Sequence, residues 1–294
     1  MAESKKGALL LAIAAAGGGI GFVWVKILLD AGATSLQVLA GRYLVSCVFM
    51  LMVLLAKPKK MEKETIKKGA VLGAVLFVSF ILMLEGLKKT TPSISAFLTN
   101  SQSVMVPVIM FVVFRKKPSI YVLLGAVMTI IGAWMLSFTG EAEMSMGAVL
   151  CLGAAVMFAL QIVLLGDYVT GCDPTHLAAV EGFVVLVMAA AFSVLKGEKL
   201  PAFGFDEISS LVMLGFFSTF AYFLLQSIGQ KHTSQFIAGI IITSESVFAA
   251  IFSWMLYGER MSPMAIGGCI MIFSAILIVE GGAKIISNLT SSEK

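Results

Sequence analysis

The stretch GLKKTTPSISAFLTN, residues 86–100, has a second version at residues 229–243, GQKHTSQFIAGIIIT. Both copies start with Gly-x-Lys-x-Thr and lead directly into a long apolar segment. A displacement of 143 residues aligns Gly86–Leu136 with Gly229–Val279 without a gap, and ten of these 51 positions are identical. Chance would give about four identities in sequence this apolar, so the pattern predicts an internal duplication. The identical positions of the first copy are Gly86, Lys88, Thr90, Ile94, Ser101, Ser103, Val104, Ser119, Gly125 and Met128.

The composition places both copies in a membrane. The chain has 294 residues, of which 59% are hydrophobic and 13% charged, whereas soluble domains carry about 25% charged residues. Its apolar runs are continuous over about 18 to 25 residues and do not alternate, which favours transmembrane helices over a β-barrel. We therefore predict an all-α integral membrane protein, with the lipid bilayer as its main surroundings.

Polar breaks divide the chain into ten predicted spans. The loops between them are short, so neighbouring helices are expected to form antiparallel hairpins within one bundle. The spans are 7–29, 35–56, 69–87, 91–114, 119–138, 145–165, 175–195, 208–228, 233–257 and 263–283.

Lysine and arginine indicate the orientation of the bundle. With the N-terminus inside, fourteen of these residues fall on the inner side and five on the outer side, and positive loops stay cytoplasmic. We expect both termini in the cytoplasm, and we interpret the net charge of +4 as a sign of topology, not of a nucleic-acid partner.

The odd number of spans in each copy has a mechanical consequence. A second copy that starts after five spans is inverted, which is the usual plan of secondary transporters. We predict two five-helix repeats, residues 1–139 and 140–294. In each Gly-x-Lys-x-Thr we expect Gly to allow a tight turn, Lys to anchor at the interface, and Thr to cap the next helix.

These segments resemble the EamA branch of the drug/metabolite transporter superfamily along essentially the whole chain. The resemblance rests on GLKKTTPSISAFLTN with the following VPV and RKKPS, on GGGIGFVWVK in the first span, and on SESVFAAIFSWMLYGERMSP in the ninth. It implies ten helices in two EamA repeats. It also implies a secondary transporter of amino acids, amphiphilic metabolites or drug-like cations, most simply an exporter in a bacterial cytoplasmic membrane.

Polar residues inside the spans are the candidate site, because they are costly in a bilayer. Glu245 lies near the middle of the ninth span, and Gln102 is its mate in the fourth. We expect Glu245 to face a central cavity, where it pairs with a substrate amine or exchanges protons; a structural glutamate between packed helices is the alternative. Proton coupling and simple facilitated flux both fit the sequence.

Two polar stripes accompany this pair, and such stripes either line a pathway or join helices by hydrogen bonds. Arg42 in the second span is expected to bond a carboxylate or helix-end carbonyls, and Gln161 joins the set. The pattern does not indicate whether Glu181 faces a cavity. The stripe residues are Ser95, Thr99 and Gln102, with Asn100 beside them, and Thr219, Tyr222 and Gln226.

Other residue types narrow the function. The chain has four cysteines and two histidines without ligand spacing, so we expect no metal site, no cofactor and no enzyme activity. Gly17, Gly18, Gly19 and Gly21 are expected to allow close helix approach or bending. The fifth and tenth spans lack polar stripes and are candidates for a scaffold or homodimer surface. A passive channel and a non-transporting sensor or scaffold remain alternatives.

Overall fold

The computed structural model describes residues 2–56, 58, 60–137, 146–199 and 203–258, with scattered positions between 263 and 278. The regular elements in these ranges are all helical. The first half contains α1 (Ala2–Asp30), α2 (Ser35–Ala56), α3 (Lys63–Leu87), α4 (Pro92–Asn100), α5 (Gln102–Phe114) and α6 (Ile120–Ser137). The second contains α7 (Met146–Tyr168), α8 (Pro174–Leu195), α9 (Phe205–Gly215), the π-helix η1 (Phe216–Ala221), α10 (Tyr222–Lys231), α11 (Gln235–Thr243), α12 (Glu245–Phe252) and the π-helix η2 (Ser253–Tyr257).

The predicted all-α membrane fold is confirmed. Eight helical segments in the described ranges are long and apolar enough to cross a bilayer, and Ile120–Gly132 is a shorter apolar helix. These correspond to the first nine predicted spans. The tenth, 263–283, lies mostly outside the described residues, as does the predicted repeat boundary at 139/140.

Three spans predicted as continuous α-helices are in fact interrupted. The fourth breaks at Ser101, between α4 and α5, and the ninth breaks at Ser244, between α11 and α12. The eighth passes through η1, where the backbone winds as a π-helix between α9 and α10. The hydropathy of a whole span does not reveal these breaks, because each falls in a short polar run, such as Thr99–Ser103 or Thr243–Ser246, with apolar residues on both sides.

The Gly-x-Lys-x-Thr segments differ from the prediction in two respects. The caps of α4 and α11 are Thr91 and Ser234, one residue beyond the expected threonines, and their hydroxyls accept hydrogen bonds from the backbone N–H of Ile94 and Ile237 at 3.3 and 3.4 Å. Thr90 instead donates to the carbonyl of Gly86 at 3.3 Å and so closes α3. The two caps are themselves 143 residues apart, which supports the duplication.

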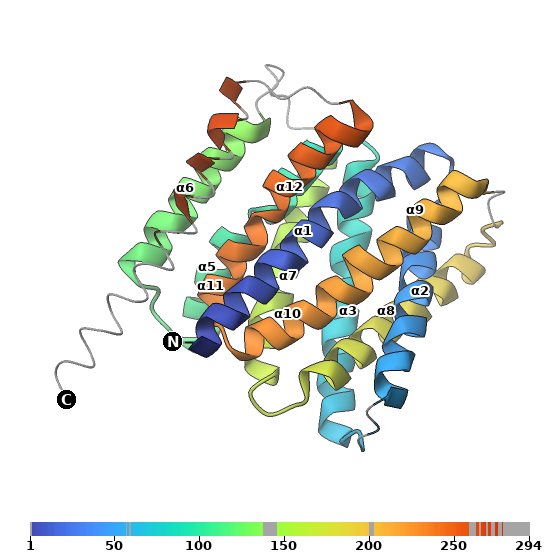
Figure 1. The fold of residues 1–294 in the computed structure, drawn as a ribbon, viewed down its shortest axis with the longest axis horizontal. Coiled ribbons are helices and arrows are strands. Elements are labelled where there is room, and N and C mark those ends of the chain that lie inside the picture. The colour runs from blue at the N-terminus through green and yellow to red at the C-terminus, as the bar shows by residue number, and fades with distance from the viewer. Residues whose placement is uncertain are drawn as a thin grey trace.

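Gly86 and Gly229 allow close helix packing. The prediction that they allow tight turns is wrong. Both lie inside helices. A Cβ at Gly86 would lie 2.9 Å from the carbonyl oxygen of Gly147 in α7, and a Cβ at Gly229 would lie 3.0 Å from that of Gly7 in α1. The first helix of each repeat thus packs on the third helix of the other, α1 beside α10 and α7 beside α3 (Figure 1).

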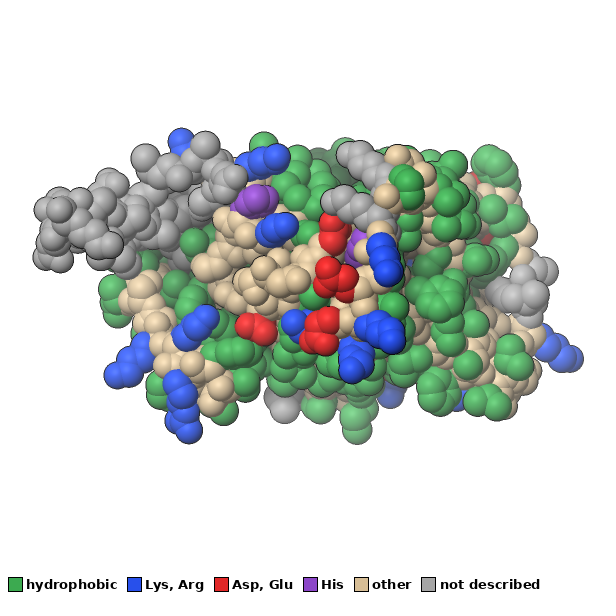
Figure 2. Space-filling model, turned by 90° about the horizontal axis from the view of Figure 1, so that it is seen from below, with side chains coloured by type: hydrophobic (Ala, Val, Ile, Leu, Met, Phe, Trp, Pro, Cys, Tyr) green, Lys and Arg blue, Asp and Glu red, His purple; other side chains and the backbone are tan. Residues whose placement is uncertain are grey.

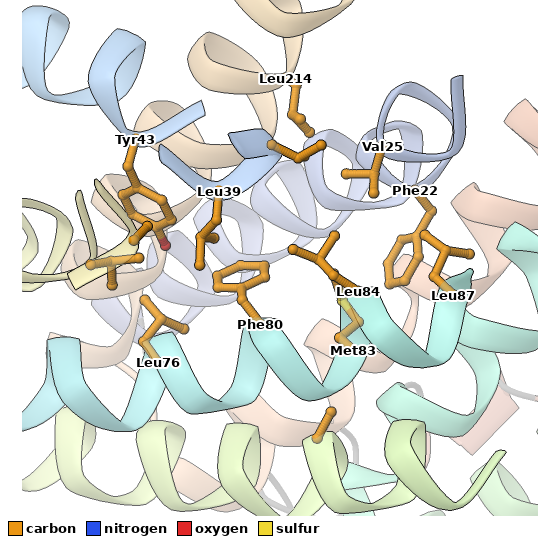
Figure 3. Close-up of a cluster of buried hydrophobic side chains, with 14 of the residues drawn as sticks. Phe22, Val25, Leu39, Tyr43, Leu76, Phe80, Met83, Leu84, Leu87 and Leu214 are labelled. Carbon is orange, nitrogen blue, oxygen red and sulfur yellow. The ribbon is translucent and has the colours of Figure 1, made fainter. Parts of the chain in front are cut away.

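An apolar core lies where α1, α2 and α3 meet. In Figure 3 the side chains of Leu76, Phe80, Met83, Leu84 and Leu87 point from α3 toward α1 and α2. All five are buried. Figure 2 shows one end of the bundle, where Lys, Arg, Asp, Glu and His side chains gather among hydrophobic ones. The bundle therefore has a packed interior, and the end shown in Figure 2 carries charged side chains, as a bilayer requires.

Candidate functional site

Two matching serines break the fourth and ninth spans. Ser101 donates to the carbonyl of Leu98, and Ser244 donates to that of Ile241, each at 2.7 Å. A second pair repeats the pattern, since Ser103 bonds to Asn100 O at 3.4 Å and Ser246 to Thr243 O at 2.7 Å. Serines that bond back to the preceding turn bend helices. All these donors and acceptors are related by the 143-residue displacement.

A cavity of about 40 Å³ lies beside the two breaks. This is smaller than the 300–1,000 Å³ of pockets that hold drug-sized ligands, so the space in this conformation does not hold a metabolite. The lining includes both polar and aromatic side chains. Its lining is Gly18, Gly21, Phe22, Val25, Arg42, Phe80, Met83, Thr99, Asn100, Gln102, Phe158, Ser218, Tyr222, Phe223 and Glu245.

Arg42 is the cation of this cavity. Its side chain is 3% exposed, and its Nε and Nη2 donate to Thr219 Oγ1 and to the carbonyl of Ser218, each at 2.8 Å. Both acceptors belong to η1, whose winding frees carbonyls from the regular helical pattern. The guanidinium also lies 4.5 Å from the ring centroid of Phe80. The π-helix therefore holds a buried arginine that keeps further N–H donors for a ligand.

Glu245 is the anion of the cavity. Its carboxylate is partly buried and accepts a hydrogen bond from the Tyr222 hydroxyl at 3.2 Å. It interacts electrostatically with Arg42, yet the two form no ion pair within 4.0 Å among the described side chains. A cavity with separated positive and negative groups suits a ligand that carries both charges.

Gln102 and Thr99 add polar atoms that have no protein partner. Gln102 Nε2 donates to Asn100 Oδ1 at 3.1 Å, and Asn100 Nδ2 donates to Ala96 O at 2.8 Å. Gln102 Oε1 and Thr99 Oγ1 are buried without a hydrogen bond. Buried polar atoms of this kind are rare unless a ligand or water serves them.

Glycines of α1 leave the space in which the carboxylate sits. A Cβ at Gly18 would lie 2.6 Å from Glu245 Oε1 and 2.8 Å from Tyr222, and a Cβ at Gly19 would lie 2.7 Å from the Glu245 carbonyl. The close approach expected of the α1 glycines is therefore present.

The structure brings six of the predicted pathway residues to one cavity: Arg42, Thr99, Asn100, Gln102, Tyr222 and Glu245. Four others do not line it. Ser95 lies 3.5 Å from Cys151 Sγ, and Thr219 bonds to Arg42. Gln161 Nε2 donates to Glu181 at 2.8 Å, and Gln226 Nε2 donates to Gln161 at 3.2 Å. The stripe 219, 222, 226 is thus divided among three different partners.

The sequence interpretation missed the aromatic wall, formed by Phe22, Phe80, Phe158 and Phe223. No signal could have found it, because the chain has 21 phenylalanines and every predicted span carries at least one. A metal is not suggested either, since no group of three or more His, Cys, Asp or Glu residues comes together in the described part.

Comparisons with known proteins identify the family. The model of the EamA-like transporter family matches residues 5–138 and 145–280. An uncharacterized transporter of Archaeoglobus fulgidus is 28% identical over 270 residues, covering 92% of this chain and 84% of its own. The uncharacterized transporter YdfC of Bacillus subtilis is 29% identical over 112 residues, covering 38% of this chain and 36% of its own.

A solved crystal structure has the same fold, with a TM-score of 0.74 and 15% identity over 93% of this chain and 98% of the other. The family and the names of the relatives indicate a transporter and not an enzyme. The chain belongs to the EamA-like transporter family and is a multi-pass membrane transporter of the drug/metabolite type.

Proposed function

We propose that the protein is a secondary transporter that moves a small zwitterion by alternating access, with an apolar amino acid as the best-fitting substrate. The observation that carries this proposal is a cavity lined by Arg42, Glu245 and four phenylalanines, in which the two charged side chains form no ion pair within 4.0 Å. Arg42 would take the carboxylate of the substrate, Glu245 its ammonium group, and the aromatic wall its side chain. Thr99 and Gln102 offer free polar atoms beside them.

The small volume of the cavity and the inverted packing of the two repeats support alternating access. A cavity of about 40 Å³ must widen before it takes a metabolite, and the bundle has an equivalent glycine contact at each end, Gly7 with Gly229 and Gly86 with Gly147. Opening one contact while the other stays closed would expose the cavity to one side at a time.

The charge pattern supports the orientation of the bundle, and the resemblance to the family supports the direction of transport. Fourteen lysines and arginines against five support cytoplasmic termini in a bacterial cytoplasmic membrane, and export is the direction we propose. Glu245, with one neutral hydrogen-bond donor, is the candidate for proton coupling. The exposed apolar face of α6, which includes Leu124, Val127 and Trp134, supports either lipid contact or the predicted homodimer.

A drug-like cation is the second candidate substrate. Glu245 with Tyr222 and the phenylalanines could bind an aromatic amine without any use of Arg42. The two candidates differ in one requirement, because only an amino acid needs the guanidinium.

The test is a thermal-shift and flux screen of purified protein with apolar amino acids, their amides and cationic drugs. A ligand at 100 times its Kd stabilises by about 2.7 kcal/mol. We expect stabilisation by free amino acids that is lost in Glu245→Gln and in Arg42→Met, with uptake into proteoliposomes lost in parallel. Glu85→Gln is the matched control, since Glu85 pairs with Lys88 at 2.8 Å at the end of α3. If amides and drugs still stabilise Arg42→Met, the proposal of a zwitterionic substrate is overturned and a cationic substrate is favoured.

A further inference from the structure

A second carboxyl group is buried in the bundle, outside the cavity described above. Glu181 in α8 is 1% exposed and does not line that cavity. Its Oε1 accepts one hydrogen bond, from Gln161 Nε2 at 2.8 Å, and its Oε2 has no partner. The proposed substrate mechanism makes no use of this residue.

The surroundings of Glu181 contain no compensating charge. α7 contributes Gln161, α10 contributes Gln226, and α3 contributes the backbone of Gly73, whose added Cβ would lie 2.7 Å from the Glu181 carbonyl. The ionisable group that interacts with Glu181 is Tyr43 of α2, which also interacts electrostatically with Arg42 and Cys47 of the same helix. No Lys, Arg or His of the described residues pairs with Glu181 within 4.0 Å.

A carboxylate in this position would be unstable. Ionised carboxylates buried without a cation are among the costliest groups in a protein interior, and a single neutral donor offsets little of that cost. A protonated carboxyl keeps the Gln161 bond through its carbonyl oxygen and turns Oε2 into a donor. The Tyr43 hydroxyl, also buried without a partner, interacts electrostatically with Glu181 from beyond hydrogen-bond distance.

We infer that Glu181 is a proton-binding site, separate from Glu245, which is occupied while α7, α8 and α10 are packed together. The bound proton joins one carboxylate oxygen, and it leaves to water when movement of these helices admits solvent. α10 carries further buried polar side chains after Gln226, since Ser227 and Gln230 are also buried with unpartnered side-chain atoms. This inference does not depend on the nature of the substrate.

Infrared spectroscopy of the purified protein at neutral pH tests the inference without any transport assay. We expect a C=O stretching band of protonated carboxyl that shifts in deuterium oxide, that is lost in Glu181→Gln and that persists in Glu245→Gln and in the control Glu85→Gln. Gln161→Leu should move the band without removing it, because the carbonyl loses its donor. This variant also answers the question if Glu181→Gln fails to fold.

Two outcomes would overturn the proton site. A carboxyl region that is the same in wild type, Glu181→Gln and Gln161→Leu would mean that Glu181 is ionised. A band that disappears on addition of Na⁺ and returns on its removal would mean that a cation takes the place of the proton, with Glu181 Oε2 and Gln226 Oε1 as its oxygens.

Discussion

Thr243 Oγ1 lies 3.4 Å from the carbonyl oxygen of Asn100, 143 positions away, and shares its single hydrogen between that oxygen and the nearer carbonyl of Gly239 at 2.9 Å. The same displacement relates the two copies of the repeat, so a residue here contacts its own mate. The helix breaks at Ser101 and Ser244 therefore meet where the two halves face each other, and Gln102 and Glu245, the first residues after the breaks, reach the same cavity.

Asn100 and Thr243 are predicted to contribute unequally to this contact. Asn100→Ala removes the bonds to Ala96 and Gln102 and leaves buried polar atoms unpaired, so it should lower the free energy of unfolding by about 1–3 kcal/mol. Thr243→Val removes the long contact with Asn100 and a bond to Gly239 within its own helix, and it should cost about 0.6 kcal/mol, a typical value between membrane helices. Denaturation in mild detergent measures both. Equal losses of stability in the two variants would show that the hydrogen bonds of Asn100 do not dominate this contact.

The sequence predicted the architecture because inversion follows from counting. Five spans per copy and an ungapped displacement lead to two inverted halves, and the structure has the corresponding cross-packing of α1 on α10 and α7 on α3. The same displacement correctly paired Gln102 with Glu245, since repeat mates near an axis must lie close together.

The rest of the site depends on backbone winding that periodicity does not reveal. A regular helix would put Thr219, Tyr222 and Gln226 on one face, but η1 changes the register, and the three side chains bond Arg42, Glu245 and Gln161 instead. The burial of Glu181 could not be predicted from periodicity either, because it depends on four neighbouring helices and not on the sequence pattern of α8.

Arg42 and Thr219 are predicted to act as a pair. A lysine at position 42 cannot donate to both Thr219 Oγ1 and Ser218 O with the planar fork of guanidinium. We expect Arg42→Lys to lose ligand-dependent stabilisation while the protein stays folded. A double-mutant cycle of Arg42→Lys with Thr219→Val should give a coupling of about 0.5–3 kcal/mol. Strict additivity would mean that η1 does not hold the arginine.

Adjacent glycines of α1 are predicted to have different roles. A methyl group at Gly18 meets the Glu245 carboxylate and the Tyr222 ring, whereas one at Gly19 meets the Glu245 carbonyl and the Ala249 N–H. Side chains can move aside but backbone cannot. Gly18→Ala should therefore weaken ligand binding with little loss of stability, and Gly19→Ala should destabilise the bundle.

Thermal unfolding with and without ligand separates these two effects. Gly171→Ala is the control, since a Cβ at Gly171 has no neighbour within 4 Å, and it should match wild type in both measurements. Ligand binding by Gly18→Ala at wild-type strength would place the ligand away from Glu245.

The glycine contacts at the two ends of the bundle are predicted to set the balance between two open states. A methyl group at Gly86 meets Cys151 and the Gly147 carbonyl, so Gly86→Ala should separate α3 from α7. Cys151 is buried at this contact and serves as a reporter once Cys47, Cys172 and Cys269 are replaced by alanine. If Gly86→Ala shifts the free-energy difference between the two states by about 1.4 kcal/mol, the population open at this end rises about tenfold. The rate of maleimide labelling of Cys151 should rise by the same factor.

Two matched variants decide whether this labelling reports opening. Gly147→Ala disturbs the same contact from the other helix, with its Cβ 3.1 Å from the Gly86 carbonyl, and should also speed labelling. Gly229→Ala disturbs the contact with Gly7 and Leu11 at the opposite end, and since alternating access opens one end at a time, it should leave Cys151 labelling at or below the wild-type rate. Faster labelling in all three variants would indicate general loosening of the bundle, and the two ends would then not be coupled gates.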